Sequence, residues 1–442
     1  MVEKKKISGW GLSPCIDAEI SRAYFLSDLT QCTIPSPFIP QGSCRSYGDA
    51  CLAKKVLSTL PLHNFIEFDA GRGLLKCEAG ITLKSILSFI VPRGYFLPVT
   101  PGTKHPTLGG CLAADVHGKN HHKEGSIANF TEEFELILAD GTKARCSRDE
   151  EAELFWATIG GMGLTGTIYS VTLRLKSISS SFIKTRNIKL NSFEKLCDYF
   201  TNPQYQSAYS VAWIDTLSSQ VGRSILMLGE HVDSTHLKNP SDMIIHSDKK
   251  YDIPFFFPEF ALNYLTMRTF NTLFYNKQIR HDRSKLVHYD PYFYPLDSIG
   301  SWNRIYGREG FLQYQFLVPF DGGRRLMQNI LKEISDRGIL SFLSILKALG
   351  KESGGLLSFP KPGYTLALDI PLKDKSVIDF LSTLTKKITR SGGRIYLAKD
   401  AIISKNDFVV MYPRLNEFKR IKKACDPHNH LRSLQSDRLG IT

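Results

Sequence analysis

Residues 101–126, PGTKHPTLGGCLAADVHGKNHHKEGS, hold the densest set of groups that could do chemistry in this chain. The glycines of this segment let the backbone come close to a bulky anionic ligand, and their free N–H groups can bind its phosphates. Ala113 and Ala114 keep the wall beside such a ligand thin. Directional polar groups follow, namely Asp115, His117, Lys119 and Asn120. The segment predicts a cradle for a phosphate-bearing cofactor; the alternative is a solvent-facing glycine-rich loop with a few histidines.

Two lysines close apolar segments that end predicted strands. Lys399 ends IYLAK, and Lys347 ends SFLSILK. A lysine that is partly removed from water can anchor a substrate, or stabilise negative charge on a reduced cofactor. The alternative for each is an exposed lysine at a strand end. We assign Lys347 to the phosphate or the hydroxyl groups of a substrate.

Three further kinds of side chain suit a ligand site. Gln313 and Gln315 point to the same face of a regular strand. Two amides on one face suit a sugar ring, although an exposed polar face of an antiparallel strand is the alternative. Trp213 forms either a wall of the site or part of the core. His117 either polarises a cofactor and relays a proton, or is simply a hydrogen-bonded loop residue.

Two motifs that suggest other sites lack the necessary context. Residues 161–166 match G-x-G-x-x-G, but they follow a predicted helix and precede a strand, whereas the dinucleotide fingerprint follows a strand and begins a helix. No carboxylate or cysteine completes a credible metal site around His121 and His122. We therefore expect neither a Rossmann site nor a metal.

Short strands and brief helices alternate between residues 35 and 174. A helix is predicted near 82–91, and a hairpin over 134–146 turns at Asp140-Gly141. A strand with alternating apolar residues follows from 167 to 175. Because helices do not separate every pair of strands, the pattern predicts an α+β fold.

A second module begins near the serine- and lysine-rich residues 176–186 and runs to about Gly393. It contains helices predicted over 323–337 and 374–390. Its residues 251–275 are rich in aromatic side chains. The basic residues that flank them are Lys249, Lys250, Lys277, Arg280 and Arg283. Such a segment lies on a membrane or admits a lipid chain, or it packs as core or as an ordered lid.

Composition limits the class of protein. The 442 residues are 42% apolar and 22% charged, which excludes disordered and fibrous classes and favours two or three domains. The net charge of +13 is dispersed, so it favours an anionic substrate or a membrane surface over nucleic acid. Nine cysteines without a C-x-x-C pair argue against structural zinc and a disulfide framework. With no signal peptide or apolar stretch of ~18 residues, we expect a cytoplasmic protein that is at most peripheral at the inner membrane.

Several segments resemble the vanillyl-alcohol-oxidase-like superfamily of FAD-binding proteins with a PCMH-type domain. They are IPQGSCRSYGDA at 39–50, PTLGGCLAADVHGKNHH at 106–122, GGMGLTGTI at 160–168 and GRIYLAKD at 393–400. Further segments are similar to the flavoprotein oxidase subunits of decaprenylphosphoryl-β-D-ribose 2′-epimerase. They include GWG at 9–11, YSVAWID at 209–215, YPLD at 294–297, WNRIYG at 302–307, QYQF at 313–316 and SFLSILK at 341–347.

The resemblance implies a two-domain α+β fold. A discontinuous FAD-binding domain comprises residues 1–178 and 394–442, and a substrate-binding domain with an antiparallel sheet comprises 179–393. FAD, held noncovalently, sits between them. The residues implied to bind FAD are Arg45, Ser46, Tyr47, Gly48, Gly102, Thr107, Gly109, Gly110, Ala114, His117, Ile168 and Tyr396. Those implied in catalysis are Lys399, His117 and Tyr47, and those implied in substrate binding are Lys347, Gln313, Gln315, Trp213 and Ala367.

The chain departs from the family at two positions. The family's pyrophosphate loop usually reads G-x-G-R-S-Y-G-D, whereas Cys44 stands here at the position of the second glycine. The epimerase subunits often carry a cysteine in a GWNICVDF-like strand, whereas this chain reads GYTLALDI with Ala367. Thiol chemistry is therefore impossible at 367, but flavin oxidation needs no thiol there.

The resemblance implies oxidation of the 2′-hydroxyl of a polyprenyl-phosphate-linked ribose to a keto sugar. A separate short-chain NAD(P)H-dependent reductase would complete the epimerisation. One alternative is a soluble sugar, alditol or aldonolactone oxidase, which returns electrons to oxygen and needs no lipid. A non-catalytic basic protein that binds nucleic acid is a third, and the chain has no recognition motif for it.

Overall fold

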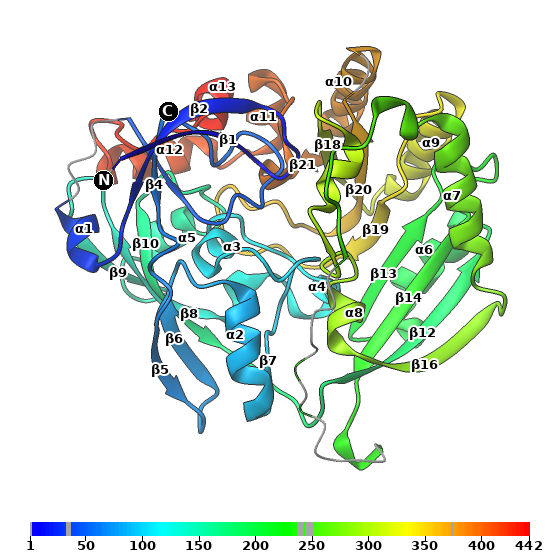
Figure 1. Cartoon of the computed structure of the whole chain (residues 1–442), viewed down its shortest axis with the longest axis horizontal. Helices are drawn as coiled ribbons and strands as arrows, with labels where there is room; N and C mark the ends of the chain where they lie inside the picture. The colour runs from blue at the N-terminus through cyan, green and yellow to red at the C-terminus, as the bar shows by residue number, and fades with distance from the viewer. Residues whose placement is uncertain (1, 32–36, 237–242, 244, 246–250, 373–374) are drawn as a thin grey trace.

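The computed structural model describes residues 2–31, 37–236, 243, 245, 251–372 and 375–442. Helices and largely antiparallel strands form an α+β architecture, which confirms the predicted fold class. In Figure 1 a four-stranded and a five-stranded sheet form a left group, and an eight-stranded sheet lies to the right. The C-terminal helices, coloured red, return to the left group beside the N-terminus.

The left group contains two sheets of short strands. The first has the order β1 (Glu3–Ser8), β2 (Cys15–Arg22), β4 (Lys55–Ser58) and β3 (Ile39–Gln41). The second has the order β5 (Phe65–Asp69), β6 (Leu74–Glu78), β10 (Thr167–Arg174), β8 (Thr131–Ile137) and β9 (Lys143–Ser147). Strands β8 and β9 form the predicted hairpin, and Gly141 turns it with φ of 86°. A side chain rarely adopts that conformation, which explains the glycine.

Short helices pack around these sheets. They are α1 (Leu26–Thr30), α2 (Leu83–Ile90), α3 (Leu108–Ala113), α4 (His121–Glu124), α5 (Ala152–Thr158), α11 (Lys405–Met411), α12 (Leu415–Cys425) and α13 (Leu434–Leu439). The side chain of Thr82 caps α2 by accepting a hydrogen bond from the amide of Ser85 at 3.2 Å. Arg438 ties the C-terminal return to the N-terminal half by an ion pair of 2.8 Å with Asp49, and it pairs with Asp400 within the return at 2.7 Å.

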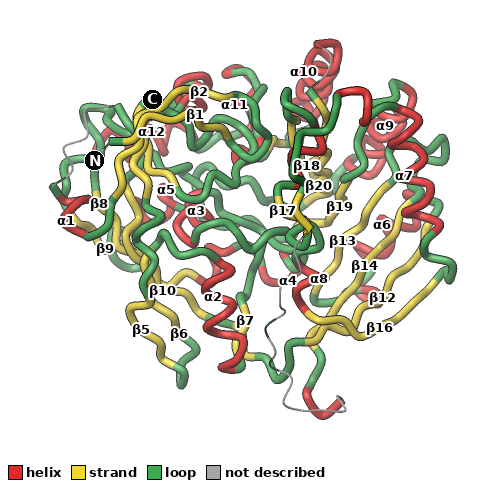
Figure 2. The backbone as a smooth tube through the Cα atoms, in the orientation of Figure 1, coloured by secondary structure: helices red, strands yellow, loops and turns green. Residues whose placement is uncertain are grey.

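The eight-stranded sheet is built mainly from the second half of the chain. Its order is β16 (Asp282–His288), β12 (Phe182–Leu190), β14 (Ser224–His231), β13 (Tyr209–Ile214), β19 (Ser344–Leu349), β20 (Gly363–Pro371), β18 (Phe311–Pro319) and β21 (Arg394–Ile395). The helices α6 (Phe193–Thr201), α9 (Gly323–Asp336) and α10 (Lys375–Arg390) contact its strands. The last two agree closely with the helices predicted at 323–337 and 374–390. The opposite face of the sheet is directed toward the group of sheets on the left of Figure 2.

The chain around Lys399 differs from the prediction. Lys399 was expected at the end of a strand, but β21 stops at Ile395 and Lys399 closes a 3-10 turn, Leu397–Lys399. The Tyr396 amide still donates to the carbonyl of Gln315 on β18 at 3.0 Å, and the Tyr396 hydroxyl donates a hydrogen bond of 2.9 Å to the carbonyl of Ala114 in the left group. The turn places Lys399 where the two groups of sheets meet.

The remaining elements connect the two groups. They include β7 (Tyr95–Phe96), β11 (Lys176–Ser177), β15 (Tyr251–Asp252), β17 (Ile299–Gly300), α7 (Tyr264–Asn276) and α8 (Tyr289–Phe293). The aromatic segment 251–275 supplies β15 and most of α7, whereas the flanking Lys249 and Lys250 lie outside the described residues. None of the helices in the described ranges is long and apolar enough to cross a bilayer.

Candidate functional site

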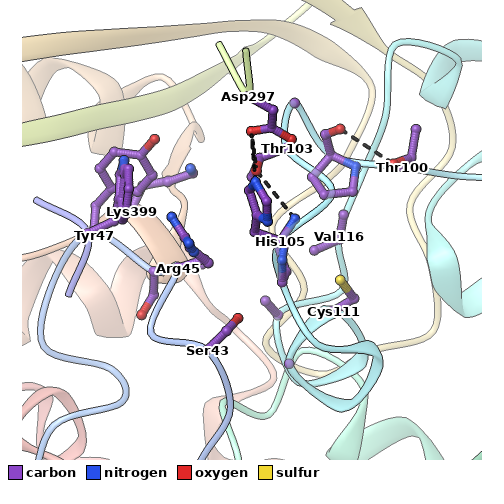
Figure 3. A pocket seen from close by; sticks show the side chains of 18 of the residues that line it. Ser43, Arg45, Tyr47, Thr100, Thr103, His105, Cys111, Val116, Asp297 and Lys399 are labelled. Carbon is purple, nitrogen blue, oxygen red and sulfur yellow. Dashed lines mark hydrogen bonds and ion pairs between the residues drawn. The ribbon is translucent and has the colours of Figure 1, made fainter. Parts of the chain in front are cut away.

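A cavity of about 840 Å³ lies where the two groups of sheets face each other. One wall consists of glycine-rich loops of the left group, and the other is a face of the eight-stranded sheet. Figure 3 shows Arg45, Tyr47 and Lys399 on one side of part of this cavity, and His105 and Asp297 on the other. The volume is typical of a site for a cofactor or a small molecule.

The loop wall is made of backbone as much as of side chains. Thr107 caps α3, since its hydroxyl accepts a hydrogen bond from the amide of Gly110 at 3.3 Å. The loop at Gly42 lies directly against this cap, where an added Cβ would come within 2.3 Å of the Thr107 hydroxyl oxygen. At Gly102 an added Cβ would meet nothing within 4 Å, so open space adjoins the backbone there. Glycines therefore shape this wall in two ways, by close packing and by leaving room.

Eleven of the twelve residues implied to bind FAD line the cavity. They are Arg45, Ser46, Tyr47, Gly102, Thr107, Gly109, Gly110, Ala114, His117, Ile168 and Tyr396. The twelfth, Gly48, is not among the lining residues. It packs against the C-terminal return instead, because a Cβ at this position would lie 1.7 Å from the carbonyl oxygen of Asp400. The structure therefore places Gly48 in the packing of the loop.

The sheet wall brings together side chains that are distant in sequence. Gln313 and Gln315 on β18 line the cavity, and Gln315 pairs with Ala367 on β20. Lys347 lines it from β19. Trp213 is not part of the lining, because its ring packs 4.7 Å from that of Phe274 on α7. Its indole N–H donates to the carbonyl of Phe342 at 2.9 Å, so Trp213 supports the wall from beside the cavity.

His117 is held neutral in a defined tautomer. Burial lowers its pKa well below the ordinary value, and the charges of Lys347 and Lys399 lower it further. The Gln315 amide nitrogen lies 3.1 Å from Nε2 of His117 and 3.2 Å from the hydroxyl oxygen of Thr365. Since that hydroxyl donates to a backbone carbonyl, the amide donates to both groups, and the His117 proton is assigned to Nδ1. This buried N–H has no partner among the described residues.

Three lysines give the cavity a positive potential. Burial lowers the pKa of Lys119 to about 7 and that of Lys347 to about 8. Burial also lowers the pKa of Lys399, whose ammonium lies 3.8 Å from the centre of the Tyr47 ring. Lys347 lowers the pKa of both other lysines. Such mutual repulsion favours an anion that binds between them.

A second set of contacts joins the loop wall to residues 290–297. The ammonium of Lys104 lies 2.5 Å from a carboxylate oxygen of Asp290, and both side chains are nearly inaccessible to solvent. Asp297 accepts hydrogen bonds from the Thr103 hydroxyl at 2.7 Å and the Lys104 amide at 2.8 Å. The hydroxyls of Thr100 and Tyr294 lie 2.7 Å apart. These contacts fix the loop that carries Gly102.

Comparison with known proteins identifies the family. A family model described as an FAD binding domain matches residues 33–147. Decaprenylphosphoryl-beta-D-ribose oxidase from Mycolicibacterium smegmatis is 32% identical over 412 residues, which are 91% of this chain and 89% of that protein. This chain belongs to the decaprenylphosphoryl-β-D-ribose oxidase family. It is an FAD-dependent oxidoreductase.

More distant relatives share parts of the oxidase. An uncharacterized protein of Streptomyces coelicolor is 28% identical over 82% of this chain and 100% of its own length. Human Delta(24)-sterol reductase is 25% identical over 46% of this chain and 38% of its own length.

The residues of the oxidase suit FAD. Open space at Gly102 can admit a bulky group beside bare backbone. Two buried donors in the cavity wall, Nε of Arg45 and the assigned Nδ1–H of His117, have no hydrogen-bond partner in the described part of the chain. Unpartnered donors and cations around a glycine-lined cavity match the phosphates and carbonyl oxygens of a flavin dinucleotide.

Both departures from the family pattern adjoin the cavity. Cys44 lines it with φ of 50°, a conformation that explains why a glycine is usual there. Its thiol faces the carbonyl of Gly42 at 4.0 Å and lies near the thiol of Cys51, which accepts a hydrogen bond from the hydroxyl of Ser46 at 3.2 Å. Each cysteine within the described ranges is free, and Ala367 leaves an apolar spot between Gln315 and Ile345.

Sequence reasoning assigned no role to several lining residues. Thr103, His105 and Asp297 were not proposed as ligands, although Asp297 lies within the YPLD segment that resembles the family. Lys119, named among the polar groups of the predicted cradle, does line the cavity. Residues 161–166 were excluded as a Rossmann fingerprint, yet Met162, Gly163 and Gly166 line the cavity. The glycine spacing of this segment therefore marked a loop at the cavity, although it did not mark a Rossmann dinucleotide site.

Proposed function

We propose that this oxidase converts the 2′-hydroxyl of a polyprenyl-phosphate-linked ribose to a ketone. The similarity to decaprenylphosphoryl-beta-D-ribose oxidase over 91% of the chain carries this proposal. The cavity supports it, because the glycine-lined wall is continuous with a wall that offers two amides and a lysine. Amides suit a sugar ring, and a buried lysine suits a phosphodiester.

The chain's own residues orient the sugar and balance charge. Bound FAD supplies the hydride acceptor. The Lys399 ammonium provides positive charge in the cavity, and the Nδ1–H of His117, on which that charge acts, provides a hydrogen-bond donor. Tyr47 presents its ring to Lys399, and Gln313 and Gln315 fix the sugar from the sheet. Lys347 binds the phosphate. FAD is held noncovalently, so acid precipitation of the protein releases it.

The function is tested by the identity of the product. Purified oxidase loaded with FAD is incubated with farnesylphosphoryl-β-D-ribose, and the product is reduced with borodeuteride. We expect deuterium at C2′ and at no other sugar carbon. Free ribose, alditols and aldonolactones serve as comparison substrates. Hydrogen peroxide formation from those compounds, without turnover of the lipid-linked sugar, would favour a soluble sugar oxidase instead.

We further propose that α7 and its neighbours lie on an anionic membrane surface. Leu265 and Leu273 on α7 are 72% and 65% exposed, and Phe260 before the helix is 79% exposed. Helix α7 carries no acidic residue. Basic residues accompany this apolar surface, namely Arg268, Lys277, Arg280, Arg283 and Lys285. An apolar helix face with cations suits the boundary between headgroups and acyl chains, from which a polyprenyl chain can enter the cavity near Lys285.

A matched pair of double variants tests the membrane contact. Leu265→Gln with Leu273→Gln removes two exposed side chains of α7, and Val409→Gln with Val410→Gln removes two on α11, which are 48% and 63% exposed. We expect the α7 variant alone to lose binding to phosphatidylglycerol vesicles in a sedimentation assay, by roughly tenfold or more. Equal binding by both variants would reject the membrane contact.

The ketone requires a second enzyme if the pathway ends in an epimer. We propose that a separate short-chain reductase uses NAD(P)H to return hydride to C2′ from the opposite face. Adding such a reductase with NADH should convert the keto sugar to the arabino epimer. Formation of the epimer by the oxidase alone would show that no partner is needed.

A further inference from the structure

A buried carboxylate lies behind the side chains that line the cavity. Asp369 on β20 is fully buried and stands directly opposite Gln313 on β18. One of its oxygens accepts a hydrogen bond from the Gln313 amide nitrogen at 2.5 Å. The other oxygen, Oδ2, has no hydrogen-bond partner in the described structure. Asp369 itself is not among the lining residues, so any effect on a ligand passes through its neighbours.

Asp369 determines which end of Gln313 is offered to a ligand. An ionised carboxylate only accepts hydrogen bonds, so the amide nitrogen of Gln313 must face it. The carbonyl oxygen of Gln313 is then the group that remains for the cavity. That oxygen accepts a hydrogen bond from a sugar hydroxyl, whereas a reversed amide would offer a donor. The cross-strand pair therefore fixes the polarity of the sheet wall at this point.

Asp369 also acts on Lys399. Burial raises the pKa of Asp369, and the Gln313 hydrogen bond and the Lys399 charge oppose that rise. Burial lowers the pKa of Lys399, and Asp369 is the acid that most strongly opposes it. The Lys399 ammonium lies over the Tyr47 ring, and no hydrogen bond joins this ammonium to another described residue. The carboxylate thus acts through space.

The surroundings of the pair contain few other groups that titrate. Lys347 also faces Lys399 and lowers its pKa. The hydroxyl of Tyr306 lies near Asp369 without a hydrogen bond of normal geometry, and burial keeps the pKa of Tyr306 well above its ordinary value. Tyr47 is likewise a neutral phenol, since burial raises its pKa. Burial raises the pKa of Asp369 to about 7, and where it is ionised it is the charge that opposes the repulsion of Lys399 by Lys347.

We propose that Asp369 is a positioning residue for sugar oxidation, which keeps Lys399 protonated and turns the carbonyl oxygen of Gln313 toward the substrate. This role rests on the proposed function for its substrate. Its effect on Lys399 does not, because the charge of Lys399 can be measured without any sugar. Removing the carboxylate makes Lys399 neutral at a lower pH, so the positive charge beside the flavin site is lost earlier on the alkaline side.

Competitive acetylation of Lys399 measures this effect directly. Acetic anhydride reacts with the neutral amine, so the labelling of Lys399 against pH, read by peptide mass spectrometry, gives the midpoint of its titration. With FAD-loaded protein we expect Asp369→Asn to lower that midpoint by about one pH unit or more, a tenfold change in the ratio of charged to neutral amine. Asp369→Glu, which keeps the charge, should retain most of the original midpoint.

Asp297→Asn is the matched control, because Asp297 is a buried acid of the same cavity that does not act on Lys399. It should leave the midpoint unchanged. An unchanged midpoint in Asp369→Asn would overturn the proposal. If that variant fails to fold, Lys399→Met provides a second measurement. Infrared spectroscopy should then show the Asp369 carboxyl protonated up to a higher pH than in the unaltered protein, and no change in that band would equally overturn the proposal.

Turnover separates this inference from the proposed function. In Asp369→Asn, the alkaline fall of kcat/KM with the lipid-linked sugar should move to lower pH by the same shift as the labelling midpoint. A shifted midpoint in a protein that never oxidises this sugar would leave the role of Asp369 toward Lys399 intact and reject the substrate.

Discussion

The two walls of the cavity do their chemistry by opposite means. The loop wall works by leaving side chains out, so that backbone at Gly42, Gly102 and Gly110 meets its neighbours or open space. The sheet wall works through side chains that strand pairing brings together, such as Gln313, Asp369 and Lys347. Lys399 belongs to neither sheet and reaches the cavity from the turn that joins the walls. We therefore propose that the first wall binds through shape and that the second discriminates through charge and hydrogen bonds.

The largest effect should follow from loss of Lys399. We expect Lys399→Met to lower turnover of the lipid-linked sugar by about 10²- to 10³-fold, because a buried charge that acts on the reacting groups is removed. Steady-state kinetics measures the effect. Lys332→Met removes an exposed lysine on α9 and should leave turnover unchanged. Similar losses of turnover in both variants would show that turnover depends on the overall charge of the protein and not on the charge of Lys399.

The loop wall is tested by a methyl group at Gly102. In the structure an added Cβ there meets nothing, so Gly102→Ala should leave thermal stability unchanged. It should weaken FAD binding by about tenfold, since the methyl group occupies space that the cofactor needs. Flavin fluorescence titration measures the affinity. Gly71→Ala, at a glycine away from the cavity, is the control; unaltered FAD affinity in Gly102→Ala would remove this position from the cradle.

Lys347 on the sheet wall should make substrate binding depend on pH. Lys347 has a pKa lowered by burial to about 8, so it is charged below that pH and neutral above it. Affinity for a phosphate-bearing substrate should be full below about pH 8 and fall as the pH rises through it. In Lys347→Met the part of this fall near pH 8 should disappear, while Lys119 and Lys399 still titrate at lower pH. Equilibrium binding of farnesyl phosphate, measured between about pH 6.5 and about pH 9.5, gives this profile for both proteins. The same profile in both would contradict the assignment of Lys347 to the phosphate.

The smallest effect concerns Cys44. Its left-handed backbone costs a non-glycine residue about 1 kcal/mol, so Cys44→Gly should raise the free energy of unfolding by roughly that amount. The loss of the contact with Cys51 reduces this gain. Urea unfolding monitored by circular dichroism measures it. A clear destabilisation would mean that the thiol pair, and not the backbone, determines stability in this loop.

The same contrast explains what could be predicted from the sequence. The loop wall is local: Thr107, Gly110 and His117 lie within eleven residues, and their types alone indicated a cradle. The Asp140-Gly141 hairpin and α9 were likewise visible in local patterns. The domain boundaries at 178 and 393 remain predictions, and β21 extends the large sheet into the first residues of the predicted return segment.

The rest of the site depends on pairings between distant segments. The residues next to Asp369 in the sequence do not mark it as part of the site. Its position depends on the pairing of β18 with β20, which sets it opposite Gln313, and on its effect on Lys399. Trp213 occupies the expected strand, but α7 covers it, and no local pattern reveals which strand positions a distant helix will cover. Lys399 was located by resemblance, while its 3-10 turn lies beside a contact between Tyr396 and Ala114 that joins segments distant in sequence.

The most direct test is an anaerobic titration of the FAD-loaded protein with farnesylphosphoryl-β-D-ribose, monitored by flavin absorbance. We predict stoichiometric bleaching of the oxidised flavin band and one equivalent of keto sugar. A protein that binds FAD but keeps its oxidised spectrum in the presence of excess lipid-linked ribose would contradict the central claim that the two walls join a flavin to this sugar.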